Sequence, residues 1–189
     1  MLGESHGVAE TAGAILTLVR ALGIRSLALE WSFDEVGDVV RGAVATGRFD
    51  LDALWAIPPG GDLFSGDGRF TAGHVRVIEH LLGVRQLVDV VPVDRLDQDP
   101  PLGDDRELAL AERVLVARRA ELPTLALVGL GHASRELSGG VAPMFVHLER
   151  SLPGLRNGGL ETPGHPLGLA VDAIFRLPSA TPAVVPARS

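Results

Sequence analysis

The sequence predicts an α/β fold, with a mostly parallel sheet that has helices on both faces. Short, mostly apolar segments alternate along the chain with amphipathic helical stripes, as in sheets whose strands are buried on both sides. The 189 residues suit one domain, which we place at residues 1–177. Residues 178–189 hold three prolines and no hydrophobic pattern, so we expect a disordered tail there.

The first half of the chain contains three helical stripes and one clear strand. Apolar residues recur at helical spacing over residues 15–22, over 36–43 and again over 71–82, where Thr71 is a predicted N-terminal cap. Between the first two stripes, residues 26–29 form a short apolar run that predicts a buried strand.

The second half continues the alternation of strands and helices. Residues 87–93 and 125–128 predict two more strands, separated by a charged helix that we expect to end near residue 120. A short helix over 144–152 and a last apolar segment over 169–177 complete the predicted elements.

The beginning of the chain departs from this pattern. Met1 and Leu2 alone precede a polar turn at residues 3–7, so most of the strand expected before that turn is missing. We expect this strand to be central in the sheet, leaving a gap beside residues 27–29 and 125–128. The chain is then either truncated and poorly stable, or part of an assembly that fills the gap. No signal peptide is visible, and we expect a cytoplasmic protein.

Absent residue types narrow the chemistry. Without Cys there is no disulfide, thiolate nucleophile or Cys-ligated metal site. All 17 basic residues are Arg, which excludes Schiff-base chemistry and the P-loop lysine. With no Tyr either, the side chains left for catalysis are those of His, Asp, Glu, Ser, Thr and Arg.

The charge and hydropathy patterns limit the partners. The formal net charge is −7 and aromatic residues make up 4% of the chain, which argues against nucleic-acid binding. No apolar run is long enough to predict a membrane span. We expect a small-molecule or peptide substrate, and the sequence carries no pattern that fixes an oligomeric state.

Polar residues suited to catalysis follow the predicted strands. Glu4 and His6 come after Met1-Leu2, Glu30 ends the next strand, and His132 follows a later one. Because the carboxyl ends of parallel strands meet at one edge of a sheet, we expect these four side chains to converge as a catalytic site. The structural alternative is an ion pair between Glu30 and an arginine, and loop histidines bonded to the backbone.

Three further residues are candidates for substrate binding. Arg69 is a possible anion clamp in a turn, and Asp94 ends a predicted strand. His74 lies on the apolar side of the helix at 71–82. Each has a structural alternative, because Asp and Arg are ordinary turn residues and a lone His on an apolar face is more often a hydrogen-bonded core residue.

Residues 3–7 also fit the pattern G-x-S-x-G, which would make Ser5 the nucleophile of an α/β-hydrolase. In that fold several strands precede the nucleophile, whereas here the pattern begins at residue three. We therefore set this interpretation aside and expect no histidine within hydrogen-bonding reach of Ser5.

The same segments resemble a known superfamily. Gly3-Glu4-Ser5-His6-Gly7, Ala28-Leu29-Glu30 and Gly129-Leu130-Gly131-His132-Ala133 are similar to the motifs of the erythromycin esterase, ChaN and Tiki superfamily. Both copies of G-x-x-H are present, and the Gly-Glu-x-His spacing is nearer the ChaN and Tiki form. The resemblance spans residues 2 to about 157 and implies an α/β fold with a site built from Glu4, His6, Glu30 and His132.

The residues and the resemblance together leave three functions open. The leading hypothesis is a hydrolase of esters, lactones or peptides, in which His6 acts as general base or in which His6, His132 and Glu30 hold a divalent metal ion with an open water position. The alternative is a ChaN-like protein that binds haem or another small ligand through His6 or His132. An inactive scaffold is the third possibility.

Overall fold

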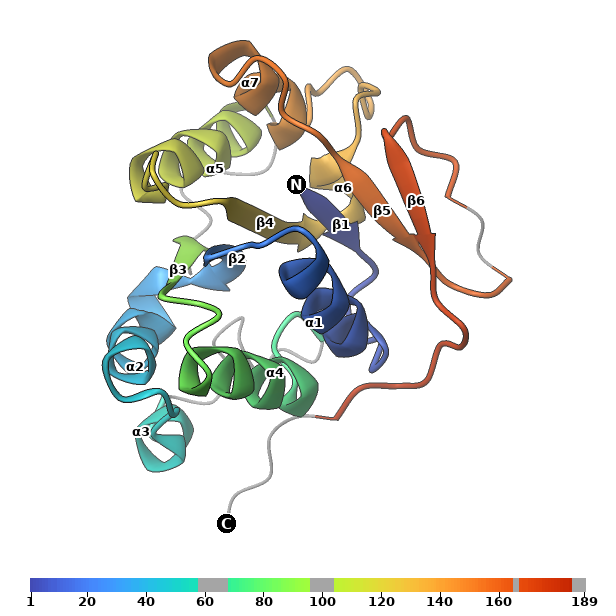
Figure 1. Ribbon diagram of the computed structural model, residues 1–189. Coiled ribbons are helices and arrows are strands. Elements are labelled where there is room, and N and C mark those ends of the chain that lie inside the picture. Colours follow the sequence, from blue (N-terminus) through green and yellow to red (C-terminus); the bar gives the residue numbers. More distant parts are fainter. Residues whose placement is uncertain (58–67, 96–103, 165–166, 185–189) are drawn as a thin grey trace.

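The computed structural model describes residues 1–57, 68–95, 104–164 and 167–184 (Figure 1). Its centre is a six-stranded sheet in which every pair of neighbouring strands is parallel. The strand order is β3-β2-β4-β1-β5-β6. The strands are β1 (Leu2–Glu4), β2 (Ser26–Ser32), β3 (Asp89–Asp94), β4 (Thr124–Gly129), β5 (Gly158–Glu161) and β6 (Ala173–Arg176).

Helices cover both faces of the sheet, as the sequence predicts. They are α1 (Thr11–Ala21), α2 (Phe33–Thr46), α3 (Leu51–Trp55), α4 (Ala72–Gly83), α5 (Asp104–Ala117), α6 (Leu130–Ala133) and α7 (Met144–Ser151). In β4, Leu125 and Leu127 face the core that contains α1, α2 and α4, whereas Ala126 and Val128 face the core that contains α5, α6 and α7. The continuous apolar run of β4 therefore reflects burial on both faces.

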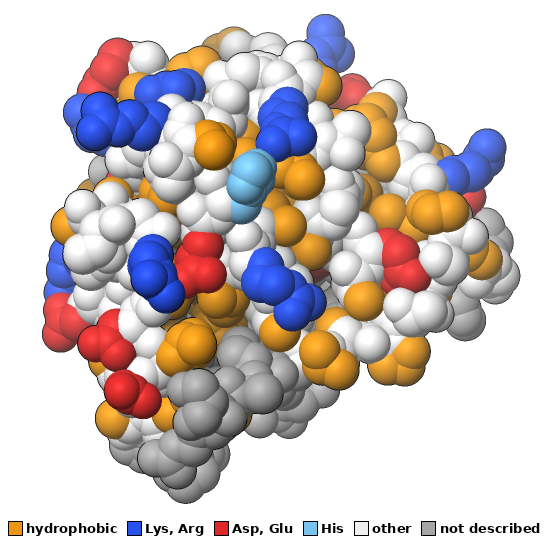
Figure 2. Space-filling model, turned by 60° about the horizontal axis from the view of Figure 1, so that its bottom comes forward, with side chains coloured by type: hydrophobic (Ala, Val, Ile, Leu, Met, Phe, Trp, Pro, Cys, Tyr) orange, Lys and Arg blue, Asp and Glu red, His pale blue; other side chains and the backbone are white. Residues whose placement is uncertain are grey.

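The surface mixes charged and apolar side chains. On the face shown in Figure 2, within the described part of the chain, arginines are interspersed with acidic and hydrophobic side chains rather than gathered in one basic patch. None of the described helices combines the length and the apolar character that crossing a membrane requires.

The prediction of a gap between residues 27–29 and 125–128 is wrong. These segments pair directly, with Leu27 opposite Leu125. The reason lies in the strand order: β4 lies between β1 and β2, so β1 pairs with β4 and β5 instead of lying beside β2. The first strand is nevertheless central, and it is only three residues long.

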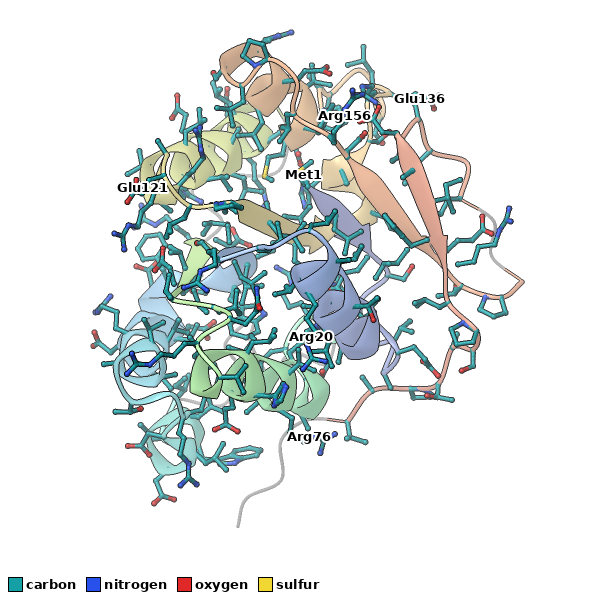
Figure 3. The ribbon with its side chains drawn as sticks, viewed as in Figure 1. Met1, Arg20, Arg76, Glu121, Glu136 and Arg156 are labelled. Atoms are coloured by element: carbon teal, nitrogen blue, oxygen red, sulfur yellow. The ribbon has the colours of Figure 1, made fainter. Side chains whose placement is uncertain are left out.

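Met1 lies at the start of β1, near Arg156 (Figure 3). Its ammonium group donates a hydrogen bond to the carbonyl oxygen of Arg156 at 2.6 Å, and burial lowers the pKa of this amino group to about 6. A cavity of about 410 Å³ lies at this end of β1, with Leu2, Leu125 and Phe175 among its lining residues. The amino ends of the central strands therefore border an apolar hollow.

The last described residues run back to the loop that follows β1. The Ala9 N–H donates to the Thr181 carbonyl at 2.9 Å, and the Glu10 carboxylate accepts from the Thr181 N–H at 3.0 Å. Within residues 178–184, the tail predicted to be disordered thus makes contacts with the body of the protein. Residues 185–189 lie outside the described part of the chain.

Candidate active site at the carboxyl ends of the strands

The structure brings together the four residues expected to form the site. Glu4 ends β1, and His6 lies in the turn just after it. Glu30 lies near the end of β2, and His132 lies in the short helix α6 that directly follows β4. Because β4 lies between β1 and β2, Glu4 and Glu30 approach the end of β4 from opposite sides.

His6 lies between two carboxylates. Its Nδ1 atom is 3.4 Å from Glu4 Oε1, and its Nε2 atom is 4.0 Å from Glu30 Oε2. The His6 side chain is 20% exposed, whereas each carboxylate is 4% exposed. Burial alone would lower the pKa of His6, but the contact with Glu4 and the charge of Glu30 raise it above the ordinary value.

Glu30 is the centre of the cluster. Its Oε2 atom accepts a hydrogen bond from the Gly129 N–H at 2.6 Å, and its Oε1 atom lies 3.3 Å from both His132 Nε2 and Arg69 Nη1. Burial opposes the charge, yet His132, Arg69 and the Gly129 amide outweigh it and lower the pKa of Glu30 to about 2. Glu30 is therefore a carboxylate at neutral pH.

The backbone of Gly129 comes close to these side chains. A Cβ atom at this position would lie 3.1 Å from His6 Nε2 and 3.5 Å from Glu30 Oε2. The glycine that ends β4 thus leaves room for the imidazole while its N–H fixes the carboxylate.

Glu107 is a member of the site that the sequence did not predict. It belongs to α5, and its carboxylate lies 2.8 Å from His132 Nδ1 and accepts a hydrogen bond from the Met144 N–H at 2.7 Å. Burial alone would lower the pKa of His132, but its contacts with Glu107 and Glu30 raise it to about 10. His132 is therefore an imidazolium held between two carboxylates at neutral pH. No local pattern marks Glu107 among the many charged residues of its helix.

Arg69 links the site to Asp94. Its Nη1 atom lies 3.3 Å from Glu30 and 3.2 Å from Asp94, and the carbonyl oxygen of Arg69 accepts from the Trp31 indole N–H at 2.8 Å. Asp94 is buried and also pairs with Arg106 at 2.8 Å. Asp94 therefore lies behind Arg69 and orients its guanidinium group.

His74 also lies behind the cluster. It is 2% exposed, its Nε2 atom is 3.7 Å from Glu4 Oε2, and its Nδ1 atom is 3.0 Å from the Thr71 hydroxyl. The small cavity at the centre of the site is lined by Glu4, His6, Leu29, Glu30, Trp31, Arg69 and Leu127. Of the three candidates for substrate binding, Arg69 reaches this cavity, whereas neither His74 nor Asp94 is among its lining residues.

Ser5 has no catalytic partner in the part of the chain that the structure describes. Among the described residues, three histidine side chains make hydrogen bonds, and their partners are Arg20, Thr71 and Glu107. None of these hydrogen bonds involves Ser5. This geometry agrees with the expectation that Ser5 is not an α/β-hydrolase nucleophile.

The resemblance implies two cofactors, a divalent metal ion and haem. Among the described residues, no three His, Asp or Glu side chains are grouped as ligands for a metal ion. The positions of His6, His132 and Glu30 do not fit one, because both oxygens of Glu30 are already engaged and one contacts the Arg69 cation. The central cavity has essentially no space into which a water-sized sphere fits, whereas pockets for drug-sized ligands hold roughly 300–1,000 Å³, so the described residues leave no room for a porphyrin there.

A second hollow adjoins the site on the side of His132. It has a volume of about 250 Å³, and its lining includes Glu107, His132, Ser138, Val141 and Pro143. A group bound there would lie next to the protonated imidazole.

The fold and the cluster define the class: an α/β protein with a parallel sheet and a buried His–Glu network at the carboxyl ends of its strands. No protein-family model and no curated protein matches the sequence. Among solved structures, the chain is similar to RRSP, a MARTX toxin effector domain from Vibrio vulnificus, with a TM-score of 0.57 and 13% sequence identity. The match covers 93% of this chain but 36% of that one, so the chain spans about a third of its length. This likeness supports the α/β fold.

Proposed function

We propose that this protein is a hydrolase that activates water with His6 to cleave an ester, lactone or peptide bond. The observation that carries the proposal is the alternation of imidazoles and carboxylates: Glu30 lies between His6 and His132, and each histidine has a second carboxylate at its Nδ1 atom. A histidine oriented by a carboxylate is the usual arrangement of a general base. The motif resemblance to the erythromycin esterase, ChaN and Tiki superfamily supports the same site.

The chemistry assigns a separate task to each imidazole. Glu4 holds the proton on His6 Nδ1, so that the Nε2 lone pair takes a proton from water as the water oxygen attacks the carbonyl carbon. His132 then gives a proton to the leaving alcohol or amine as its bond to the carbonyl carbon breaks. The products are a carboxylic acid and that alcohol or amine, and proton exchange with water restores both histidines.

Arg69 and Glu30 complete the proposed mechanism. Arg69 reaches the central cavity and offers a positive charge to the oxygen that becomes negative in the transition state. Glu30 keeps His132 protonated and fixes the distance between the two imidazoles. The hollow beside His132 offers space for the leaving group.

The test is a panel of esters, lactones and short peptides, assayed with protein purified without chelators. We expect turnover that EDTA does not abolish, and a loss of about 10²–10⁴-fold in kcat for His6→Gln and for Glu30→Gln. His80→Gln, on an exposed part of α4, is the matched control and should keep full activity.

Three outcomes would contradict the proposal. A stoichiometric metal together with loss of turnover in EDTA would favour the metal-dependent version. A Soret band on haemin titration that His6→Ala removes, without turnover, would favour the haem-binding alternative. Wild-type protein that turns over no substrate in the panel would overturn the hydrolase assignment.

The cytoplasmic location that we expect is checked by cell fractionation.

A further inference from the structure

The buried side of the network contains a third histidine that the proposed mechanism does not use. His74 is 2% exposed and lies in α4, outside the lining of the central cavity. We propose that His74 is a positioning residue: it holds Glu4 from the side opposite His6, so that Glu4 fixes the proton of His6 on Nδ1 and leaves Nε2 free for water. This inference rests on the proposed function and assigns His74 a role behind Glu4 instead of on the substrate.

The proton of His74 is placed by Thr71. The backbone N–H of His74 donates to Thr71 Oγ1 at 3.2 Å, and His74 Nδ1 lies 3.0 Å from the same oxygen. When the hydroxyl donates to Nδ1, both groups are satisfied and the ring proton lies on Nε2. The other tautomer would point the Nε2 lone pair at a carboxylate and leave the buried hydroxyl hydrogen without this acceptor. The helix cap therefore directs an N–H toward Glu4.

Glu4 is held between two imidazoles. Its Oε1 atom lies 3.4 Å from His6 Nδ1, and its Oε2 atom lies 3.7 Å from His74 Nε2. Burial disfavours this carboxylate, but the contacts with His6 and His74 outweigh burial and lower the pKa of Glu4 below its usual value. His6 and His74 thus both stabilise the negative charge of the Glu4 carboxylate.

The other two carboxylates of the network are anchored differently. Glu30 accepts a hydrogen bond from the Gly129 N–H at 2.6 Å, and Glu107 accepts one from the Met144 N–H at 2.7 Å. In the described part of the chain, the ion pairs of the Glu4 carboxylate are with the imidazoles of His6 and His74. His74, whose Nε2 atom lies 3.7 Å from Glu4 Oε2, is therefore the polar group behind Glu4, where a backbone amide contacts each of the other two carboxylates.

The surroundings keep His74 in place. The Trp31 ring packs edge-on against it, with ring centroids 6.4 Å apart and an interplanar angle of 78°. Trp31 also donates to the carbonyl oxygen of Arg69 at 2.8 Å. Trp31 thus contacts both His74, which lies behind Glu4, and Arg69, which reaches the central cavity.

The experiment compares two substitutions at this position. His74→Leu removes the donor, whereas the amide of His74→Gln can donate from nearly the position of Nε2. We expect His74→Leu to lower kcat by about 10–100-fold, the loss seen in metal sites when the hydrogen-bond partner of a metal ligand is removed, with KM within about twofold of wild type. We expect His74→Gln to recover most of the loss.

A second measurement does not need a substrate. Side-chain ¹⁵N NMR of the unliganded protein reports which nitrogen of His6 carries the proton at a pH where the ring is neutral. We expect the Nδ1–H form to dominate in wild type, to lose population in His74→Leu and to return in His74→Gln. His80→Gln, on the same helix, is the control for both measurements.

The outcomes separate this inference from the proposed function. Unchanged kcat and an unchanged His6 spectrum in His74→Leu would overturn it, and so would equal losses in the Leu and Gln variants with their melting temperatures unchanged. If His74→Leu fails to fold, the spectrum of His74→Gln decides, because a wild-type tautomer supports the inference and a changed one overturns it. If wild type turns over no substrate, the proposed function fails, whereas the His6 spectra still decide whether His74 acts through Glu4.

Discussion

At the scale of single residues, the network surrounds its two partly exposed imidazoles, those of His6 and His132, with different amounts of negative charge. Both histidines have a raised pKa, but His132 lies between two carboxylates at 3.3 and 2.8 Å, whereas His6 contacts one at 3.4 Å and the other at 4.0 Å beside the Arg69 cation. Within a common pH range, one ring can therefore be neutral while the other is charged. This separation is what a general base and a general acid require.

The pH dependence of kcat/KM follows from this separation. Activity should rise with pH as His6 loses its proton, through a pKa above its ordinary value of 6.5, because only the neutral ring accepts a proton from water. It should fall near pH 10, where His132 loses the proton that it donates. A profile measured from pH 5 to 11 checks both limbs, and a profile that is flat above pH 8 through pH 11 would contradict the role of His132.

Glu107→Gln tests the cause of the raised pKa of His132. The amide keeps an oxygen for the Met144 N–H but removes the negative charge beside Nδ1. We expect the alkaline limb to move toward neutral pH by about one unit or more, since loss of a close carboxylate commonly shifts a pKa by that amount. Glu112→Gln, exposed on the same helix, should leave the limb in place. An unmoved limb in Glu107→Gln would show that Glu30 alone sets the protonation.

At the scale of elements, two short connections carry the site. The end of β4 leads directly into α6, so that Gly129 and His132 lie within one turn of each other. Gly3 in β1 allows this turn to pack closely, because a Cβ atom there would lie 2.7 Å from Ala133 Cβ and 3.1 Å from Leu130 Cα. Glycine at positions 3 and 129 thus determines how closely His6 and His132 approach the end of β4.

Gly129→Ala should lower kcat more than stability. Its φ of −58° is open to any residue, so the backbone is not strained, but the new methyl would lie 3.1 Å from His6 Nε2 and displace the ring. We expect a loss of about 10-fold or more in kcat, because small misplacements of reacting groups are costly. Gly131→Ala is the matched control, since a Cβ there meets nothing within 4 Å. Equal activity of both variants would contradict the placement of His6.

Gly3→Ala should act mainly on stability. The added methyl meets the packed Ala133 side chain and the Leu130 backbone, and overpacking of this kind typically costs about 1–3 kcal/mol. Gly13→Ala, at an exposed position of α1 with nothing within 4 Å, should instead stabilise the protein by about 0.5–1 kcal/mol. Urea denaturation of both variants measures the difference, and a neutral Gly3→Ala would mean that α6 shifts without cost.

The sequence predicts those elements that have a strong local pattern. β2 and β4 each contain a short apolar run, residues 27–29 and 125–128, and the polar residues that follow these runs mark the site because chain direction alone places them at one edge. β5 was not predicted, because Gly158-Gly159 carries no side chains to form a strand pattern. Glu107 was missed for a related reason: it joins the site only through the packing of α5 against α7, which no local pattern encodes.

At the scale of the whole molecule, strand order was the feature that the sequence did not reveal. The expectation of a gap assumed that consecutive strands are neighbours, as they often are. Here β4 lies between β1 and β2, and β5 and β6 extend the sheet on the other side of β1. Backbone hydrogen bonds between parallel strands are nearly the same for every order, so no local pattern of the sequence encodes the order.

The position of β4 between β1 and β2 also affects the order in which the strands pair during folding. β2 finds its partner β3 about 60 residues further on, but β1 pairs with residues 127–129 and 158–159, more than 120 residues away. During synthesis, β1 therefore cannot pair with β4 or β5 until most of the chain has left the ribosome. Closing the long loop between β1 and these strands is also slow. In refolding from denaturant, the return of the His6–His132 pair should coincide with the last and slowest phase, after the pairing of β2 with β3.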